Sequence, residues 1–218
     1  IEVAGVDGGQ GARVSAAFRG VSGKSTQAMG QIDALLKQNG IQNASLNFSE
    51  VDTVPAEFCN VIDVFAPFRD LGGGHLSSPQ TKFEVKPLGG EWGVRAGHIE
   101  AQVVVQVNTA GLSGEPRLIY VHESGAMQLF ALSDFLQGYK EDLGGGKFRI
   151  NLPVEELGWA GMILLSGKGP FDPKVFKHTE WGEAQSWKQR IPELARAQGW
   201  KSEMVWFKVV NEQPDAAH

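Results

Sequence analysis

The chain has 218 residues, of which 42% are hydrophobic and 21% charged, and its formal net charge is −5 at pH 7. These values are ordinary for a globular protein and exclude wholesale disorder. A mildly acidic chain lacks the positive surface that binds phosphate backbones, so we expect no nucleic-acid partner. The length fits one large domain or two small ones.

Cys59 is the only cysteine, which excludes an intrachain disulfide and a cysteine-based zinc site and leaves the compartment open. No run approaches the ~20 apolar residues of a transmembrane helix. The first residues do not have the basic start and apolar core of a signal peptide. Because the chain begins with Ile1 rather than Met, we expect a processed product or an excised fragment, and a membrane anchor upstream remains open.

The first part of the chain predicts an N-terminal β-α-β-α unit over residues 1–70. Residues 1–11 are rich in glycine and are expected to form a loose lead-in. In the residues that follow, segments in which apolar residues alternate are succeeded by segments in which they recur at helical spacing. The patterns predict a strand at 13–19, a helix at 25–38 stopped by Asn39-Gly40, a strand at 41–51 and a helix at 55–67.

The glycine-rich segment 71–79 is the best linker candidate, and the pattern beyond it changes to period two. Five strands are expected in the second domain, together with a hairpin and a C-terminal helix that is interrupted at Pro192. The strands lie at 82–87, 99–107, 148–152, 159–166 and 203–210, the hairpin at 117–130 and the helix at 179–198. We therefore predict an α+β fold, with an antiparallel β-sandwich over residues 80–212.

Gly23-Lys24-Ser25-Thr26 follows a predicted strand and opens a helix, as a phosphate-binding loop does. Such a loop needs a glycine where this chain has Phe18, whose side chain would crowd the phosphate. Ser25 or Thr26 as a helix N-cap explains the same residues, and we favour this interpretation.

No catalytic or metal-binding motif reaches useful specificity. The five histidines, at positions 75, 98, 122, 178 and 218, lack the spacing that places two imidazoles on one metal. Folding could still bring His98 and His122 together with Glu100 or Glu123, but a surface histidine is the favoured interpretation. Ser166 lacks the preceding glycine of an esterase elbow, and Cys59 is expected to be a buried, inert thiol. No catalytic residue, metal or cofactor is predicted.

Aromatic residues are concentrated late in the chain, beyond what a connecting segment needs. We identify Phe171, Phe176, Trp181 and Trp187 as candidates for contact with a ligand or partner, since exposed aromatics often dominate binding energy. The alternative, which we favour, is that they cap the open end of the sandwich.

Two segments carry a family resemblance. Tyr120-Val-His-Glu-Ser-Gly125 followed by Met127-Gln-Leu-Phe130, and Met162-Ile-Leu-Leu-Ser166 followed by Pro170-Phe171, resemble a hairpin and a late strand of one domain. That domain, of unknown function, lies C-terminal to bacterial serine/threonine kinases. Residues 54–67 are similar to a segment that often precedes it. The resemblance covers residues 51–210 and transfers no catalytic residues, because the kinase motifs are missing from the sequence.

The resemblance implies a non-enzymatic, extracytoplasmic or periplasmic sensor or interaction region of a bacterial signalling kinase or envelope protein. Its partner would be a small ligand, a cell-wall fragment or a protein. A cytoplasmic location stays open. Two alternatives also stay open: a structural subunit of an envelope or secretion assembly, and a hydrolase whose site is scattered along the chain.

Overall fold

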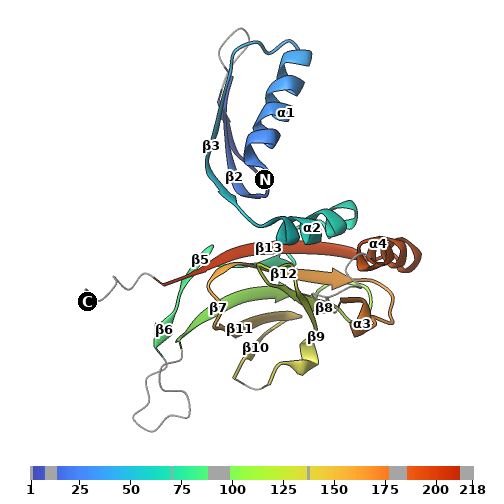
Figure 1. Ribbon diagram of the computed structural model, residues 1–218. Coiled ribbons are helices and arrows are strands. Elements are labelled where there is room, and N and C mark those ends of the chain that lie inside the picture. Colours follow the sequence, from blue (N-terminus) through green and yellow to red (C-terminus); the bar gives the residue numbers. More distant parts are fainter. Residues whose placement is uncertain are drawn as a thin grey trace. The chain divides into compact units, whose positions relative to one another are not determined.

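The computed structural model describes residues 2–7, 14–69, 71–87, 99–136, 138–176 and 186–211 (Figure 1). The chain divides into two compact units, Ile1–Cys59 and Asn60–His218. The division falls inside helix α2 (Ala56–Phe65), whereas the sequence pattern placed it at 71–79. That segment is tied into the second unit, because the backbone N–H groups of Gly74 and His75 donate to the Glu203 carboxylate at 3.0 and 2.9 Å.

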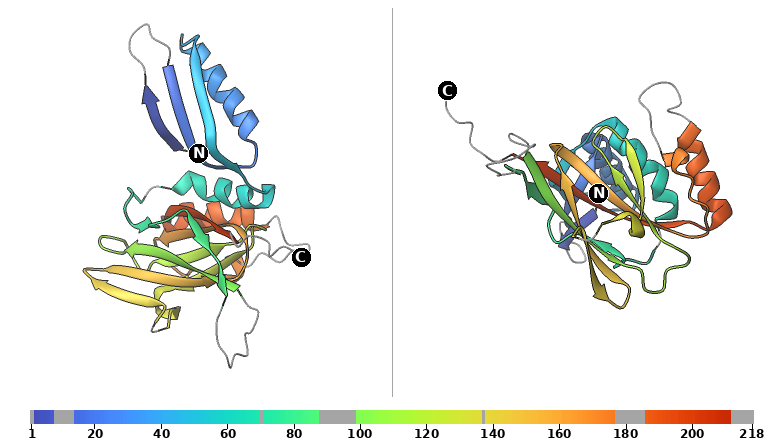
Figure 2. Two further views of the ribbon diagram at one scale, coloured as in Figure 1. Left: turned by 90° about the vertical axis from the view of Figure 1, so that its left-hand side faces the viewer. Right: turned by 90° about the horizontal axis from the view of Figure 1, so that it is seen from below.

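The first unit is a sheet of three strands in the order β1-β2-β3, with helix α1 (Ser25–Gln38) connecting β2 to β3 (Figure 2). The strands are β1 (Glu2–Asp7), β2 (Val14–Ser22) and β3 (Ala44–Thr53). β2 pairs parallel with β3 and antiparallel with β1. The expected loose lead-in is therefore wrong over residues 2–7. The glycine-rich sequence has no strand pattern, and residues 2–7 form a strand because they pair with β2.

Helix α1 has the predicted bounds, and Gly40 follows it with a φ of 83°. Its start differs from the prediction. The N-cap position falls on Lys24, whose side chain makes no capping hydrogen bond, so an N-cap at Ser25 or Thr26 is wrong. The hydroxyl that serves the entry turn belongs to Ser22, whose Oγ accepts from the Lys24 N–H at 3.1 Å.

The second unit contains two mostly antiparallel sheets within its described residues. The first has the order β10-β11-β7-β4, with β6 also on β7, and the second has the order β5-β13-β12-β8-β9. The first sheet comprises β4 (Leu76–Ser77), β6 (Lys86–Pro87), β7 (Ile99–Asn108), β10 (Lys140–Gly144) and β11 (Lys147–Val154). The second comprises β5 (Lys82–Glu84), β8 (Arg117–Val121), β9 (Met127–Ala131), β12 (Gly158–Ser166) and β13 (Lys201–Val210).

Both sheets contribute to one hydrophobic core. β7 places Val103 and Val105 in this core, β12 places Met162 and Leu164 there, and β13 adds Phe207. The alternation predicted for 99–107 and the hairpin at 117–130 are confirmed, and so is the α+β class. β10 was not predicted, because its short sequence of charged residues and glycine has no apolar alternation.

The other face of the second sheet is buried as well. Ile119, Ile163 and Leu165 are fully buried although they alternate with the core residues of the same strands. Helix α4 (Ser186–Gln198) supplies further buried side chains, including Ile191. It continues through Pro192, so the predicted interruption is wrong. The missing N–H costs one helical hydrogen bond, and the burial of the helix offsets this loss.

Three short helices complete the described secondary structure. They are η1 (Ala66–Phe68), η2 (Leu132–Asp134) and α3 (Pro173–Phe176). None of the helices in the described part of the chain has the length and apolar character needed to cross a membrane.

One short segment pairs with both sheets of the second unit, at one corner. Within residues 82–87, β5 pairs with β13 through Lys82 and Lys208, and β6 pairs with β7 through Lys86 and Glu100. Strands that pass from one sheet to another in this way form the corners of β-structures. The candidate site lies at this corner.

Candidate ligand-binding site at the sheet corner

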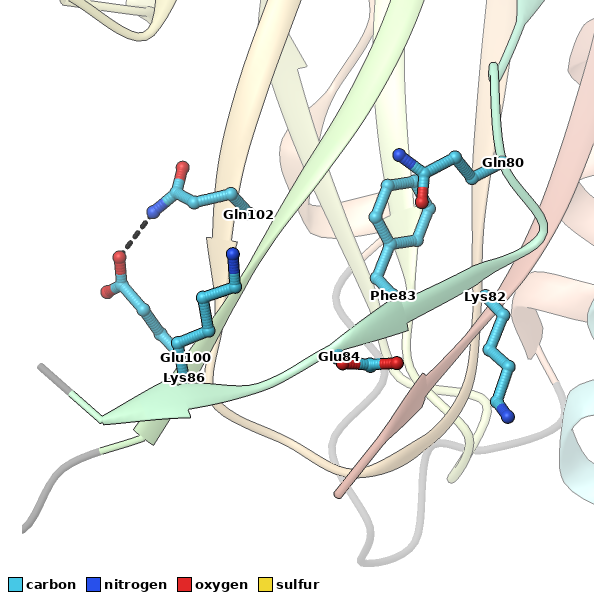
Figure 3. Close-up of a pocket in the computed structure, with 7 residues that line it drawn as sticks. All are labelled: Gln80, Lys82, Phe83, Glu84, Lys86, Glu100 and Gln102. Atoms are coloured by element: carbon cyan, nitrogen blue, oxygen red, sulfur yellow. Dashed lines mark hydrogen bonds between the residues drawn. The ribbon is translucent and has the colours of Figure 1, made fainter. Parts of the chain in front are cut away.

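A cavity of about 410 Å³ opens between β5, β6 and β7 (Figure 3). It combines charged and amide side chains with one aromatic ring. The lining residues are Gln80, Lys82, Phe83, Glu84, Lys86, Glu100 and Gln102.

The cavity exists because the pairing between two antiparallel segments stops. Lys86 pairs with Glu100, and continuing that register would bring Glu84 opposite Gln102. Instead, the described ladders pair Glu84 with Val210 of β13 and Gln102 with Pro153 of β11. The two strands therefore diverge from the Lys86–Glu100 pair (Figure 3).

Backbone polar groups border this gap on both sides. On β5, Thr81 O accepts from Lys208 N and Val85 N donates to Val210 O, so the peptide groups of Glu84 between them face away from β13. On β7, the side away from β11 is marked by Val104 O, which accepts from Ser78 Oγ at 2.9 Å. Gln102 is two residues away and directs its own N–H and C=O to the same side.

The side chains place positive charges, negative charges and two amide groups at the cavity. Lys86 and Gln102 lie on one side of the opening, and Gln80 and Phe83 lie on the other (Figure 3). The Gln102 side-chain amide donates to the Glu100 carboxylate. Phe83 is 4% exposed and meets Phe207 edge to face, with ring centroids 5.7 Å apart, so it forms a rigid apolar wall.

The side chains that line the cavity are suited to binding a polar molecule. The two lysines and two glutamates balance in formal charge, so the cavity has partners for either sign. The glutamines donate and accept hydrogen bonds. A few polar groups around an apolar wall fix the orientation of a small ligand.

The aromatic candidates from the sequence lie elsewhere, beside α3 and α4. Phe176 is fully buried and Trp187 is 5% exposed, which favours packing for these two. Phe171 is half-buried and stacks on Trp200, with ring centroids 5.2 Å apart, and the Arg117 guanidinium carbon lies 5.5 Å from the centroid of the Phe171 ring. Trp181 lies outside the described residues. None of the described candidates reaches the cavity at the sheet corner.

The histidines form local contacts where the structure describes them. His122 Nδ1 lies 2.6 Å from the Glu156 carboxylate and edge-on to the Tyr120 ring. Burial, followed by the charge of Glu156, raises the pKa of Tyr120. His75 Nδ1 lies 2.8 Å from the Asn108 carbonyl. The remaining three histidines lie outside the described residues. The part of the chain that the structure describes contains no cluster of three or more His, Cys, Asp or Glu side chains that could hold a metal ion.

Cys59 lies on α2, as the sequence predicts, and is half-buried rather than buried. Its neighbour is Gly23. A Cβ at position 23 would lie 2.8 Å from the Cys59 Sγ. The glycine of the Gly-Lys-Ser-Thr segment is thus needed for packing against a thiol.

The residues at the corner were not among the candidates predicted from the sequence. The patterns predict strands at 82–87 and 99–107, and the polar rows of these strands include Lys86 and Glu100. Such rows are typical of solvated strand faces, so each alone carried no signal. The informative feature is a positive and a negative side chain on two strands that pair. This feature depends on a contact between residues that are far apart in the sequence.

Comparison with protein-family models, with curated proteins and with solved structures found no match. The resemblance to a kinase-associated domain over residues 51–210 therefore stays a prediction.

Proposed function

We propose that the second unit is a non-enzymatic binding module, which holds a small polar ligand at the sheet corner. The observation that carries this proposal is the cavity of about 410 Å³, where Lys86, Glu100 and Gln102 face Gln80 and Phe83 across an interrupted ladder. Its volume is that of a small-molecule site.

The construction of the corner supports binding. Phe83 is fixed by the core, and Lys86 and Glu100 sit on paired strands, so the polar groups are held by a rigid sheet. A ligand that replaces water there loses little free energy in ordering the protein, since preorganised groups reduce the cost of association. The resemblance to a kinase-associated region would make this ligand the signal of an extracytoplasmic sensor.

The test is a thermal-shift screen of the 218-residue chain against amino acids, short peptides, sugars, cell-wall fragments and small carboxylic acids. A ligand at about 100 times its Kd stabilises the folded state by about 2.7 kcal/mol, which is a measurable rise in Tm. Gln102→Trp fills the cavity. Gln106→Trp is the matched control, because Gln106 is also exposed and lies on the same face of β7.

We expect at least one compound to raise the Tm of the wild type and of Gln106→Trp but not of Gln102→Trp. The proposal fails if no compound raises the Tm, or if Gln102→Trp responds like the wild type. Mass spectrometry of the compounds after incubation adds a second criterion. Conversion of a bound compound into product would overturn the non-enzymatic assignment.

A further inference from the structure

We infer that the ligand of this cavity is a free α-amino acid, whose carboxylate binds Lys86 and whose ammonium group binds Glu100. This inference rests on the proposed function and specifies the ligand class. It follows from two opposite charges that lie side by side without pairing, from the balance of charge in the lining and from the apolar wall across the opening.

Lys86 and Glu100 are directly opposite each other where β6 pairs with β7. The Cβ atoms of such a pair lie about 5 Å apart, so opposite charges there attract each other. These two side chains nevertheless form no ion pair, because the ion pairs between described residues join other side chains. The Glu100 carboxylate accepts from the Gln102 amide instead, and Lys86 extends toward the side where Gln102 lies (Figure 3). An ammonium group and a carboxylate are thus both available at one end of the cavity.

This pair favours a ligand that carries both charges. An anion that binds Lys86 is also repelled by Glu100, and a cation that binds Glu100 is also repelled by Lys86. The other charged lining residues, Lys82 and Glu84, have opposite charges as well, so they favour neither sign. A zwitterion satisfies both members of the pair and keeps the net charge of the occupied cavity at zero.

A zwitterion also compensates for lost hydration better than an uncharged ligand does. Two charged side chains that lose water need partners, and an opposite charge is a stronger partner than a hydroxyl dipole. An α-amino acid carries its carboxylate and its ammonium group on the same carbon. The two groups therefore lie side by side, as do the side chains of Lys86 and Glu100.

The far side of the opening is suited to the side chain of the amino acid. Phe83 is held against Phe207 and presents an apolar wall, and the Gln80 amide lies beside it (Figure 3). One apolar wall and a few polar groups fix the orientation of a small ligand. The charged pair would hold the α-carbon, and the wall would contact what projects from it.

The test titrates the 15N-labelled, 218-residue chain with each standard free L-amino acid and follows the backbone amide shifts. The one that binds most tightly is then compared with its carboxamide, which lacks the negative carboxylate, and with its N-acetyl derivative, which lacks the positive ammonium group. We expect each derivative to bind about tenfold more weakly, because each loses one charge-assisted hydrogen bond. The largest shifts should fall within residues 84–86 and 100–102.

Two variants separate the two contacts. In Lys86→Met the free amino acid should bind no better than its carboxamide, and in Glu100→Gln no better than its N-acetyl derivative. Lys147→Met and Glu141→Gln are the matched controls, since they change exposed residues of the same sheet that do not line the cavity. Both controls should keep both differences.

Equal affinity for the free amino acid and either derivative overturns the inference, and so do differences that survive in Lys86→Met and Glu100→Gln. A second result would also overturn it: no amino acid binds, while another compound from the thermal-shift screen binds the wild type and not Gln102→Trp. In that case the proposed function stands, because the cavity binds a ligand of a different class. If no compound binds at all, both fail.

Discussion

Gly23 and Cys59 are in such close contact that the glycine has no room for a side chain. A Cβ at position 23 would lie 2.8 Å from the Cys59 Sγ, which is closer than such atoms approach in proteins. The Gly-Lys-Ser-Thr segment therefore owes its glycine to packing between the end of β2 and helix α2. This relationship gives a physical reason for a motif that the sequence made look like a phosphate loop.

Gly23→Ala should destabilise the chain by about 1–3 kcal/mol, the usual cost of overpacking. Gly30→Ala is the control, because a Cβ at position 30 of α1 meets nothing within 4 Å. It should stabilise the chain by about 0.5–1 kcal/mol through helix propensity. Urea denaturation measures both changes. Adding Cys59→Ala to Gly23→Ala should recover part of the loss, and a strictly additive double variant would contradict the contact.

Phe176→Ala should destabilise the second unit strongly, because Phe176 is fully buried and packs near Trp200, with ring centroids 5.9 Å apart. We expect a loss of about 3–5 kcal/mol and a fall in Tm of roughly 10 °C. Phe171→Ala should cost less, since Phe171 is only half-buried. Thermal melts followed by circular dichroism check both. An unchanged Tm for Phe176→Ala would contradict the core role of Phe176 and favour contact with a ligand or partner.

Tyr120 should make the fold sensitive to alkaline pH. It is 8% exposed, and burial followed by the charge of Glu156 raises its pKa above the value of about 10 in the unfolded chain. Between these two pKa values the unfolded state binds fewer protons, so stability is full below pH 10 and falls as the pH rises above it. Tyr120→Phe should show a smaller loss of unfolding free energy between pH 8 and pH 11. Parallel pH profiles for the two proteins would contradict this linkage.

Local patterns were sufficient to predict several elements. Helix α1, the hairpin of β8 and β9, and the buried row of β7 follow directly from spacing and alternation. The local patterns did not predict the elements whose formation depends on tertiary contacts. β1 forms because β2 offers it a partner, and α4 passes through Pro192 because its burial offsets a lost hydrogen bond.

The site could be predicted less well than the fold. The aromatic residues near α3 and α4 drew attention by composition, yet Phe176 and Trp187 are buried in packing. The cavity depends on where the pairing of residues 82–87 changes from β13 to β7, and this change has no local signature. Lys86 and Glu100 become informative only once the register places them together.

Hydrogen–deuterium exchange with a ligand from the thermal-shift screen tests the central claim most directly. Ligand binding at the sheet corner should slow exchange in residues 82–86 and 100–104, because the peptide groups of Glu84 and Gln102 border the cavity. Exchange in residues 171–176 should stay unchanged. Protection confined to 171–176, or none at the corner while the Tm rises, would contradict the account.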